Sequence, residues 1–107
     1  MEQINKIELS GIVGRINITA IGDTKFARLS LCTETITQGQ DGGVIIDCMW
    51  FSCTVWEGER ICELNRIQRG SKIHLVGRVR MHRYVDVGGC ERQSWEVVAN
   101  ELQIIKD

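Results

Sequence analysis

The chain of 107 residues is long enough to bury one hydrophobic core and short enough to form one domain. Hydrophobic residues make up 43% of it and charged residues 25%, a balance that argues against disorder. The formal net charge of −1 gives no overall sign of a nucleic-acid partner, and no apolar run approaches the roughly 18 residues of a membrane-spanning helix.

The first half of the chain is predicted to form three strands. Residues 4–17 form a long strand in which Gly11 and Gly14 indicate strong bending or a bulge. Residues 26–37 alternate cleanly between two faces. After the loop QGQDGG, residues 44–56 form the third strand.

The second half is expected to contain a short helix and two more strands. In EGERICELNRIQRG, Ile61, Leu64 and Ile67 recur every third residue, which predicts an amphipathic helix ended by Gly70 as its C-cap. Two strands follow at residues 71–85 and 92–105, joined by the hairpin sequence DVGG. Three strands, a helix and two strands, without proline, predict an all-β OB-fold, a five-stranded, partly open Greek-key barrel.

The third strand carries two of the three tryptophans. With a period of two, one face presents Trp50, Ser52, Thr54 and Trp56. The other face, predicted to be core, presents Met49, Phe51, Cys53 and Val55. Two large apolar rings therefore lie on a polar face.

The fourth strand carries a basic face. One parity presents Lys72, His74, Val76, Arg78, Arg80, His82 and Tyr84, and the other is apolar. Residues 66–92 hold seven basic and two acidic residues, a net charge of +5. Bases stack on aromatic rings while arginines follow phosphates, so these two faces together favour single-stranded nucleic acid over a protein or small-molecule ligand. Without the aromatic rings, the arginines would indicate only a solvated face.

Three segments resemble the bacterial single-stranded DNA-binding protein family over nearly the whole chain, from Asn5 to about Asn100. They are NKIELSG, WFSCTVWEG and RIQRGSKIHLVGRVRMHRYVDVGGCERQSWEVVAN, in the family's order and spacing. The resemblance implies that Trp50, Trp56 and Tyr84 stack on DNA bases. It also implies a homotetramer or dimer that acts in DNA replication, repair or recombination.

The chain departs from the family in several places, among them Phe51, where family members commonly carry a histidine near a subunit contact. Residues 35–37 replace a further family tryptophan, which leaves one stacking platform missing. Trp95 has no counterpart and is expected to pack on the last strand. The family's long acidic tail has no equivalent after LQIIKD, so recruitment of replication enzymes by a tail is not expected.

Residues 1–107 are thus interpreted as one nucleic-acid-binding OB domain that coats single-stranded DNA without sequence preference. The expected phosphate contacts are Lys72, Arg78, Arg80, His82 and Arg83. One alternative is a primosome-type replication accessory protein that binds DNA and protein partners. Another is an interaction module that uses the Trp50/Trp56 face as a subunit interface.

Catalysis, cofactors and metal ions are not expected. No P-loop, paired carboxylates or Ser/His/Asp arrangement occurs in the sequence. The five cysteines are odd in number and lack C-x-x-C spacing, so Cys32 and Cys53, on apolar faces, are interpreted as buried thiols. The charged first eleven residues lack a signal peptide's apolar region, which predicts a cytoplasmic protein without a membrane partner.

Overall fold

Five long strands make up most of the chain in a computed structural model that describes residues 2–105. Their bounds are β1 Ile7–Ile21, β2 Thr24–Gln38, β3 Val44–Trp56, β4 Lys72–Val85 and β5 Glu91–Ile104. Every predicted strand is present, and β3 has the predicted bounds. Lys106 and Asp107, on which the expectation of a missing tail partly rests, lie outside the described residues.

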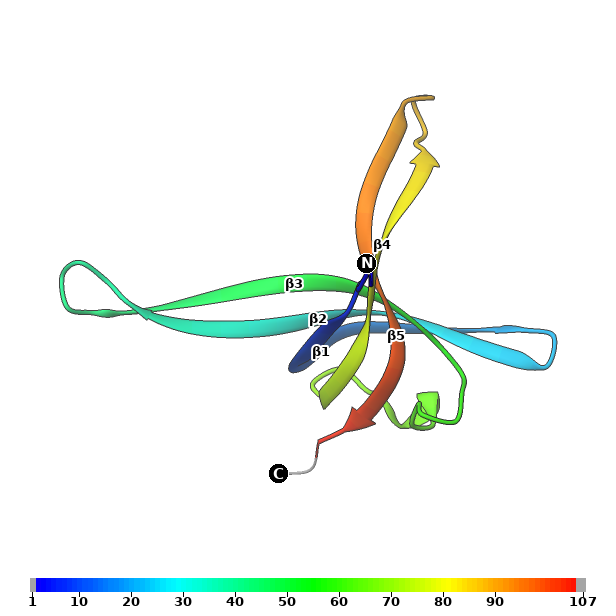
Figure 1. The fold of residues 1–107 in the computed structure, drawn as a ribbon, viewed down its shortest axis with the longest axis horizontal. Coiled ribbons are helices and arrows are strands. Elements are labelled where there is room, and N and C mark those ends of the chain that lie inside the picture. The colour runs from blue at the N-terminus through cyan, green and yellow to red at the C-terminus, as the bar shows by residue number, and fades with distance from the viewer. Residues whose placement is uncertain (1, 106–107) are drawn as a thin grey trace.

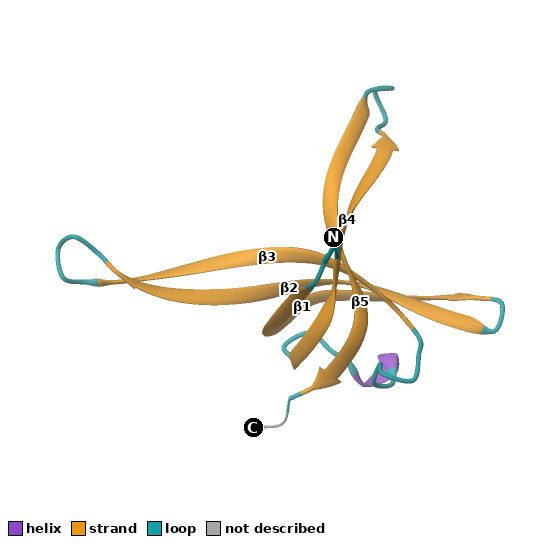
Figure 2. Cartoon of the chain, in the orientation of Figure 1, coloured by secondary structure: helices purple, strands orange, loops and turns teal. Residues whose placement is uncertain are grey.

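The strands close into a barrel in the order β1-β2-β3-β5-β4, with β4 returning to β1 (Figures 1 and 2). Neighbouring strands are antiparallel except β3 and β5, which pair in parallel over only three positions, from Cys53↔Val97 to Val55↔Ala99. A closed five-stranded barrel of this order is the predicted OB-fold.

The bend that the glycines of β1 predict is present. The first half of β1 pairs with β4 and the second half with β2, and the pairing with β2 shifts register between Val13 and Ile16. A side chain at Gly11 would collide with the backbone carbonyl of Cys32 in β2. Glycine is therefore required where β1 turns from one neighbour to the other.

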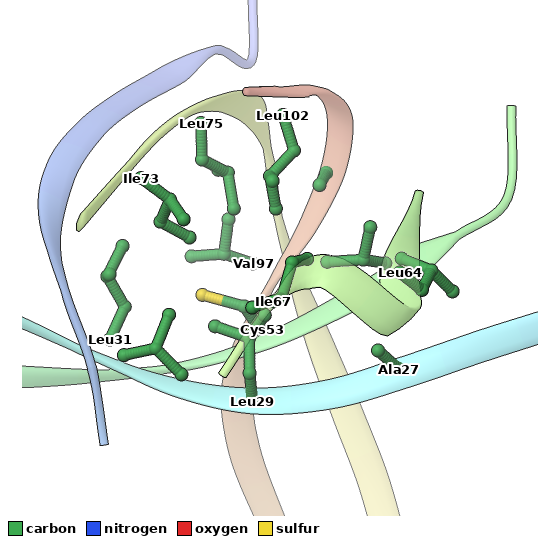
Figure 3. Packing of buried hydrophobic residues seen from close by; sticks show 13 residues of the cluster. Ala27, Leu29, Leu31, Cys53, Leu64, Ile67, Ile73, Leu75, Val97 and Leu102 are labelled. Carbon is green, nitrogen blue, oxygen red and sulfur yellow. The ribbon is translucent and has the colours of Figure 1, made fainter. Parts of the chain in front are cut away.

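Thirteen buried side chains fill the barrel (Figure 3). Leu31, Ile73, Leu75 and Leu102 are among the largest of those that are fully buried. Leu64 and Ile67, from the segment between β3 and β4, close one end of the barrel as their spacing predicts. Burial of such side chains is the main source of stability in a domain of this size.

The predicted helix is wrong in type and length. Only Leu64–Arg66 are helical, as a 3-10 turn whose C-cap is Ile67 rather than Gly70. The flanking backbone is held by other elements, because Cys62 N–H donates to the Leu102 carbonyl and Gly70 N–H to the Val13 carbonyl. The backbone on both sides of the turn is thus bonded to β5 and β1 rather than to a continuing helix. Among residues 2–105 no helix is long and apolar enough to cross a membrane.

Three hairpins extend beyond the barrel as two-stranded arms, β1–β2, β2–β3 and β4–β5 (Figure 1). An arm has no facing sheet, so both of its faces reach solvent. Met49, predicted to be core, is therefore 61% exposed on the β2–β3 arm. On the same strand, Cys53 and Val55 are buried as predicted because they lie inside the barrel.

The prediction of two buried free thiols is correct for Cys53 and wrong for Cys32. Cys53 is a buried free thiol, as expected, and burial raises its pKa to about 12. Cys32 is also buried, but it forms a disulfide with Cys48 across the β2–β3 hairpin. Spacing along the chain does not reveal this pair, because the two residues become diagonal neighbours only through the register Cys32↔Trp50 and Glu34↔Cys48.

Candidate nucleic-acid interface

An open groove of about 600 Å³ lies where the β4–β5 arm leaves the barrel beside β2 and β3. Polar and aromatic side chains from all five strands line it. They are Arg15, Phe26, Arg28, Ser30, Ser52, Thr54, Trp56, Arg80, His82, Ser94, Trp95 and Glu96. Three arginines face one carboxylate, so the lining is cationic.

Trp56 provides an aromatic platform in this groove. Phe26 lies directly opposite it on β2, and the two rings stack with centroids 4.8 Å apart and planes inclined by 29°. The Arg28 guanidinium lies 5.8 Å from the Phe26 centroid. Trp56 remains 44% exposed, so it is available to a flat ligand while Phe26 supports it.

Trp50 lies at the edge of a second cavity of about 240 Å³, which Ile7, Val79 and Trp95 also line. Its indole covers Gly14 of β1, and it is 58% exposed. Trp50 and Trp56 therefore share one face of β3, as the alternation predicts, but they line different cavities.

Tyr84 lies farther out, on the β4–β5 arm. It is 45% exposed and stacks with His82, with ring centroids 5.8 Å apart. The turn beyond it is held by Asp86, whose carboxylate accepts hydrogen bonds from the Gly88 and Cys90 N–H groups and from Arg92. Led by the Arg92 contact, these hydrogen bonds lower the pKa of Asp86.

Glu96 connects β3, β4 and β5 at the floor of the groove. Its carboxylate accepts hydrogen bonds from Arg80 Nε at 2.8 Å and from Thr54 Oγ1 at 2.9 Å. Burial raises the pKa of Glu96, but the Arg80 and Thr54 hydrogen bonds outweigh this effect and hold the pKa below its ordinary value. The charge of Arg80 is thus partly neutralised by a neighbour inside the groove.

The predicted phosphate-binding residues do not lie together. Arg80 and His82 line the groove, and Arg83 lines a smaller cavity beside Tyr84. Arg78 is exposed on β4 but lines none of these three cavities. Lys72 pairs with Ile12 at the other end of β4, about 20 Å from Arg78 at about 3.3 Å per residue.

Sequence reasoning missed several groove residues, above all Phe26, Arg28 and Trp95. The first two could have been found by counting the β2–β3 register back from the loop, which places Phe26 opposite Trp56 and Arg28 opposite Thr54. Trp95 was expected to pack on the last strand, but it is 65% exposed. Within residues 2–105, no group of three or more His, Cys, Asp or Glu side chains could hold a metal ion.

The barrel and groove define an OB-fold protein with an open aromatic and cationic surface. The chain belongs to the single-strand binding protein family, whose sequence model matches residues 4–105. The single-stranded DNA-binding protein of Xanthomonas axonopodis pv. citri is 29% identical over 106 residues, which are 95% of this chain and 58% of that protein. The corresponding Neisseria meningitidis protein is 23% identical, with coverage of 95% and 60%. The chain thus spans about 60% of the length of these relatives.

Solved structures support the same fold. A Plasmodium falciparum SSB in complex with ssDNA superposes with a TM-score of 0.74 at 20% identity, covering 98% of this chain and 96% of that one. A deletion mutant of the Thermus aquaticus single-stranded DNA binding protein gives 0.75 at 15% identity, covering 96% and 51%. At these identities the likeness shows the fold alone.

Proposed function

We propose that the protein binds single-stranded DNA without sequence preference, in the groove that Trp56 and Arg28 line. The single observation that carries this proposal is the exposed Trp56 ring, stacked on Phe26 beside three arginines. Aromatic faces accept every base, and guanidinium groups contact the phosphates that all sequences share. Family membership and the names of the relatives support the same ligand.

In the proposed mechanism, bases stack on Trp56, Trp50 and Tyr84 while the phosphates contact arginines. Arg15 and Arg28 supply phosphate contacts in addition to the predicted Arg80. Arg80 already bonds Glu96, so a phosphate has to share or replace that carboxylate. Arg78 extends the cationic surface along β4, and His82 lies on the same strand face.

The cellular role that we propose is non-catalytic protection of single strands in replication, recombination or repair. The protein is further proposed to act as a homo-oligomer, which the exposed apolar pair Ile36 and Ile46 of the β2–β3 arm supports. Sedimentation over a range of concentrations tests this point, because a monomer at all concentrations contradicts it.

A cytoplasmic location is also proposed. Disulfides are uncommon in that compartment, so the Cys32–Cys48 bond gives the proposal a direct test. Fractionation of cells should recover the protein in the cytoplasmic fraction. Thiol labelling in the intact cells, before fractionation, measures whether Cys32 and Cys48 are bonded to each other. Recovery only in another compartment, with the disulfide intact, would contradict the proposal.

Tryptophan fluorescence during titration with oligonucleotides of several lengths tests the proposed ligand. Stacking should quench the emission of Trp50 and Trp56, and oligonucleotides of different sequence but equal length should quench it equally. If the folded protein shows unchanged emission at low salt, the Trp50/Trp56 face is a subunit interface instead. Double-stranded DNA of equal length is the matched control ligand.

A further inference from the structure

Trp95 lies at the fork where β5 separates from β3. The two strands pair from Cys53↔Val97 to Val55↔Ala99 and no farther toward Trp95. Beyond that point β3 continues into the β2–β3 arm, while β5 belongs to the β4–β5 arm, which runs in another direction (Figure 1). Strand alternation places Trp95 on the same side as the buried Val97, but the fork leaves its indole 65% exposed.

The two cavities that hold Trp56 and Trp50 meet at this indole. Trp95, Ser52 and Glu96 are the three residues that line both of them. Trp56 and Trp50 are six residues apart on β3, which is about 20 Å at about 3.3 Å per residue. Trp95 therefore supplies an aromatic surface in the gap between the two exposed tryptophans of β3.

We propose that Trp95 is a further base-stacking residue, which joins the Trp56 cavity to the Trp50 cavity along one continuous path for a single strand. This inference rests on the proposed function, since the occupant is the same DNA strand. Continuity with the arginine-lined groove selects that occupant over a second copy of the chain.

Charge determines which side of the strand meets Trp95. Its chain neighbour Glu96 carries a carboxylate that the Arg80 and Thr54 hydrogen bonds stabilise as an anion. Because Glu96 and Arg80 are paired, the other cations of the larger groove are Arg15 and Arg28, and the phosphates are directed toward these two side chains. The base is then the part of the nucleotide that faces the indole and the Ser52 hydroxyl.

The test compares Trp95→Ala and Trp95→Phe in titrations with oligothymidylates of several lengths. Trp95→Ala should bind about 5- to 150-fold more weakly, the range for one stacked base, and Trp95→Phe should retain most of the affinity. The loss should grow once the oligonucleotide is long enough to reach from Trp56 to Trp50. Circular dichroism and sedimentation check the fold and the mass of each variant.

A second measurement follows Trp95 alone, in a Trp50→Phe/Trp56→Phe protein. Binding of oligothymidylate should quench its emission. If the wild-type protein binds DNA but Trp95→Ala binds equally well and this emission is unchanged, the inference is wrong while the proposed function stands. If Trp95→Ala alters oligomeric mass but not affinity per site, Trp95 belongs to a subunit contact and the inference is wrong. If the wild-type protein does not bind, both proposals fail.

Discussion

The indole of Trp50 covers Gly14 so closely that a Cβ on that glycine would lie 2.5 Å from the Trp50 Cζ3 atom. The contact joins β1 to β3, although β2 lies between these strands in the sheet. The same Cβ would lie 2.9 Å from Ser30 Oγ, which accepts a hydrogen bond from the Arg15 N–H. Gly14 thus leaves the space in which the Trp50 ring lies.

Replacing Gly14 with alanine should therefore displace Trp50 and weaken binding of single-stranded DNA. The expected loss is part of the roughly 1–3 kcal/mol of one stacked base, with the barrel still folded. Fluorescence titration and thermal unfolding measure the two effects. Gly58→Ala is the matched control, because its Cβ would meet the nearest side-chain atom, Ile61 Cγ1, at an ordinary 3.7 Å. Equal affinity of the two variants would contradict the positioning role of Gly14.

Phe26→Ala should weaken DNA binding only while Trp56 is present. Phe26 stacks beneath Trp56, and an aromatic pair of this kind is worth about 0.5–1.5 kcal/mol beyond the area that it buries. A double-mutant cycle of Phe26→Ala and Trp56→Ala, read by DNA affinity, measures the coupling. Additive losses would show that Phe26 contacts DNA by itself or acts through the fold.

Arg28→Ala should flatten the salt dependence of binding. Each lost phosphate contact on a single strand reduces the slope of log affinity against log salt by about 0.7. Arg28 lines the groove, whereas the control Arg60→Ala removes an exposed arginine that pairs with Glu101 and lines none of the three cavities. An unchanged slope for Arg28→Ala, or an equal change for both variants, would remove Arg28 from the phosphate-binding set.

Glu96→Gln should change how stability depends on pH. The Arg80 and Thr54 hydrogen bonds lower the pKa of Glu96 in the folded state, so its charged form contributes stability above the unfolded value of about 4.5. This contribution is lost as the pH falls from there through the folded pKa. Wild-type protein should exceed Glu96→Gln in melting temperature at pH 7, and the gap should narrow in acid. Glu101→Gln, in the exposed pair with Arg60, is the matched control, and parallel profiles of wild type and Glu96→Gln would contradict the prediction.

Alternation along a strand predicts which side chains share a face, and it gave the exposed positions of Trp50, Trp56 and Tyr84 correctly. It does not show whether another sheet covers that face. Met49 has the parity of the core but lies on an arm with nothing opposite it, and Trp95 has the parity of Val97 but lies at a fork. Both errors arise because β3 and β5 extend beyond the barrel, where no facing strand covers their side chains.

The residues that line the groove were harder to predict than the residues that share one face of a strand. A groove is formed by several strands, and its lining depends on the register between them. Lys72 and Arg78 share a parity on β4, yet the length of the strand separates them. Arg28 and Trp56 are 28 residues apart in the chain and line one groove through the β2–β3 register. The segment 57–70 was misjudged for a related reason, since its backbone bonds to β1 and β5 instead of completing a helix.

Closure of the barrel by β1 and β4 has a consequence for how the chain reaches its native state. Ile12 pairs with Lys72, sixty residues later, whereas β1–β2 and β2–β3 pair across short turns. Contacts between distant residues form slowly because the intervening chain must first lose entropy. On the ribosome, residues 7–12 therefore present an unpaired edge until β4 has been synthesised, and this edge is where a nascent chain is most exposed to pairing with the wrong strand.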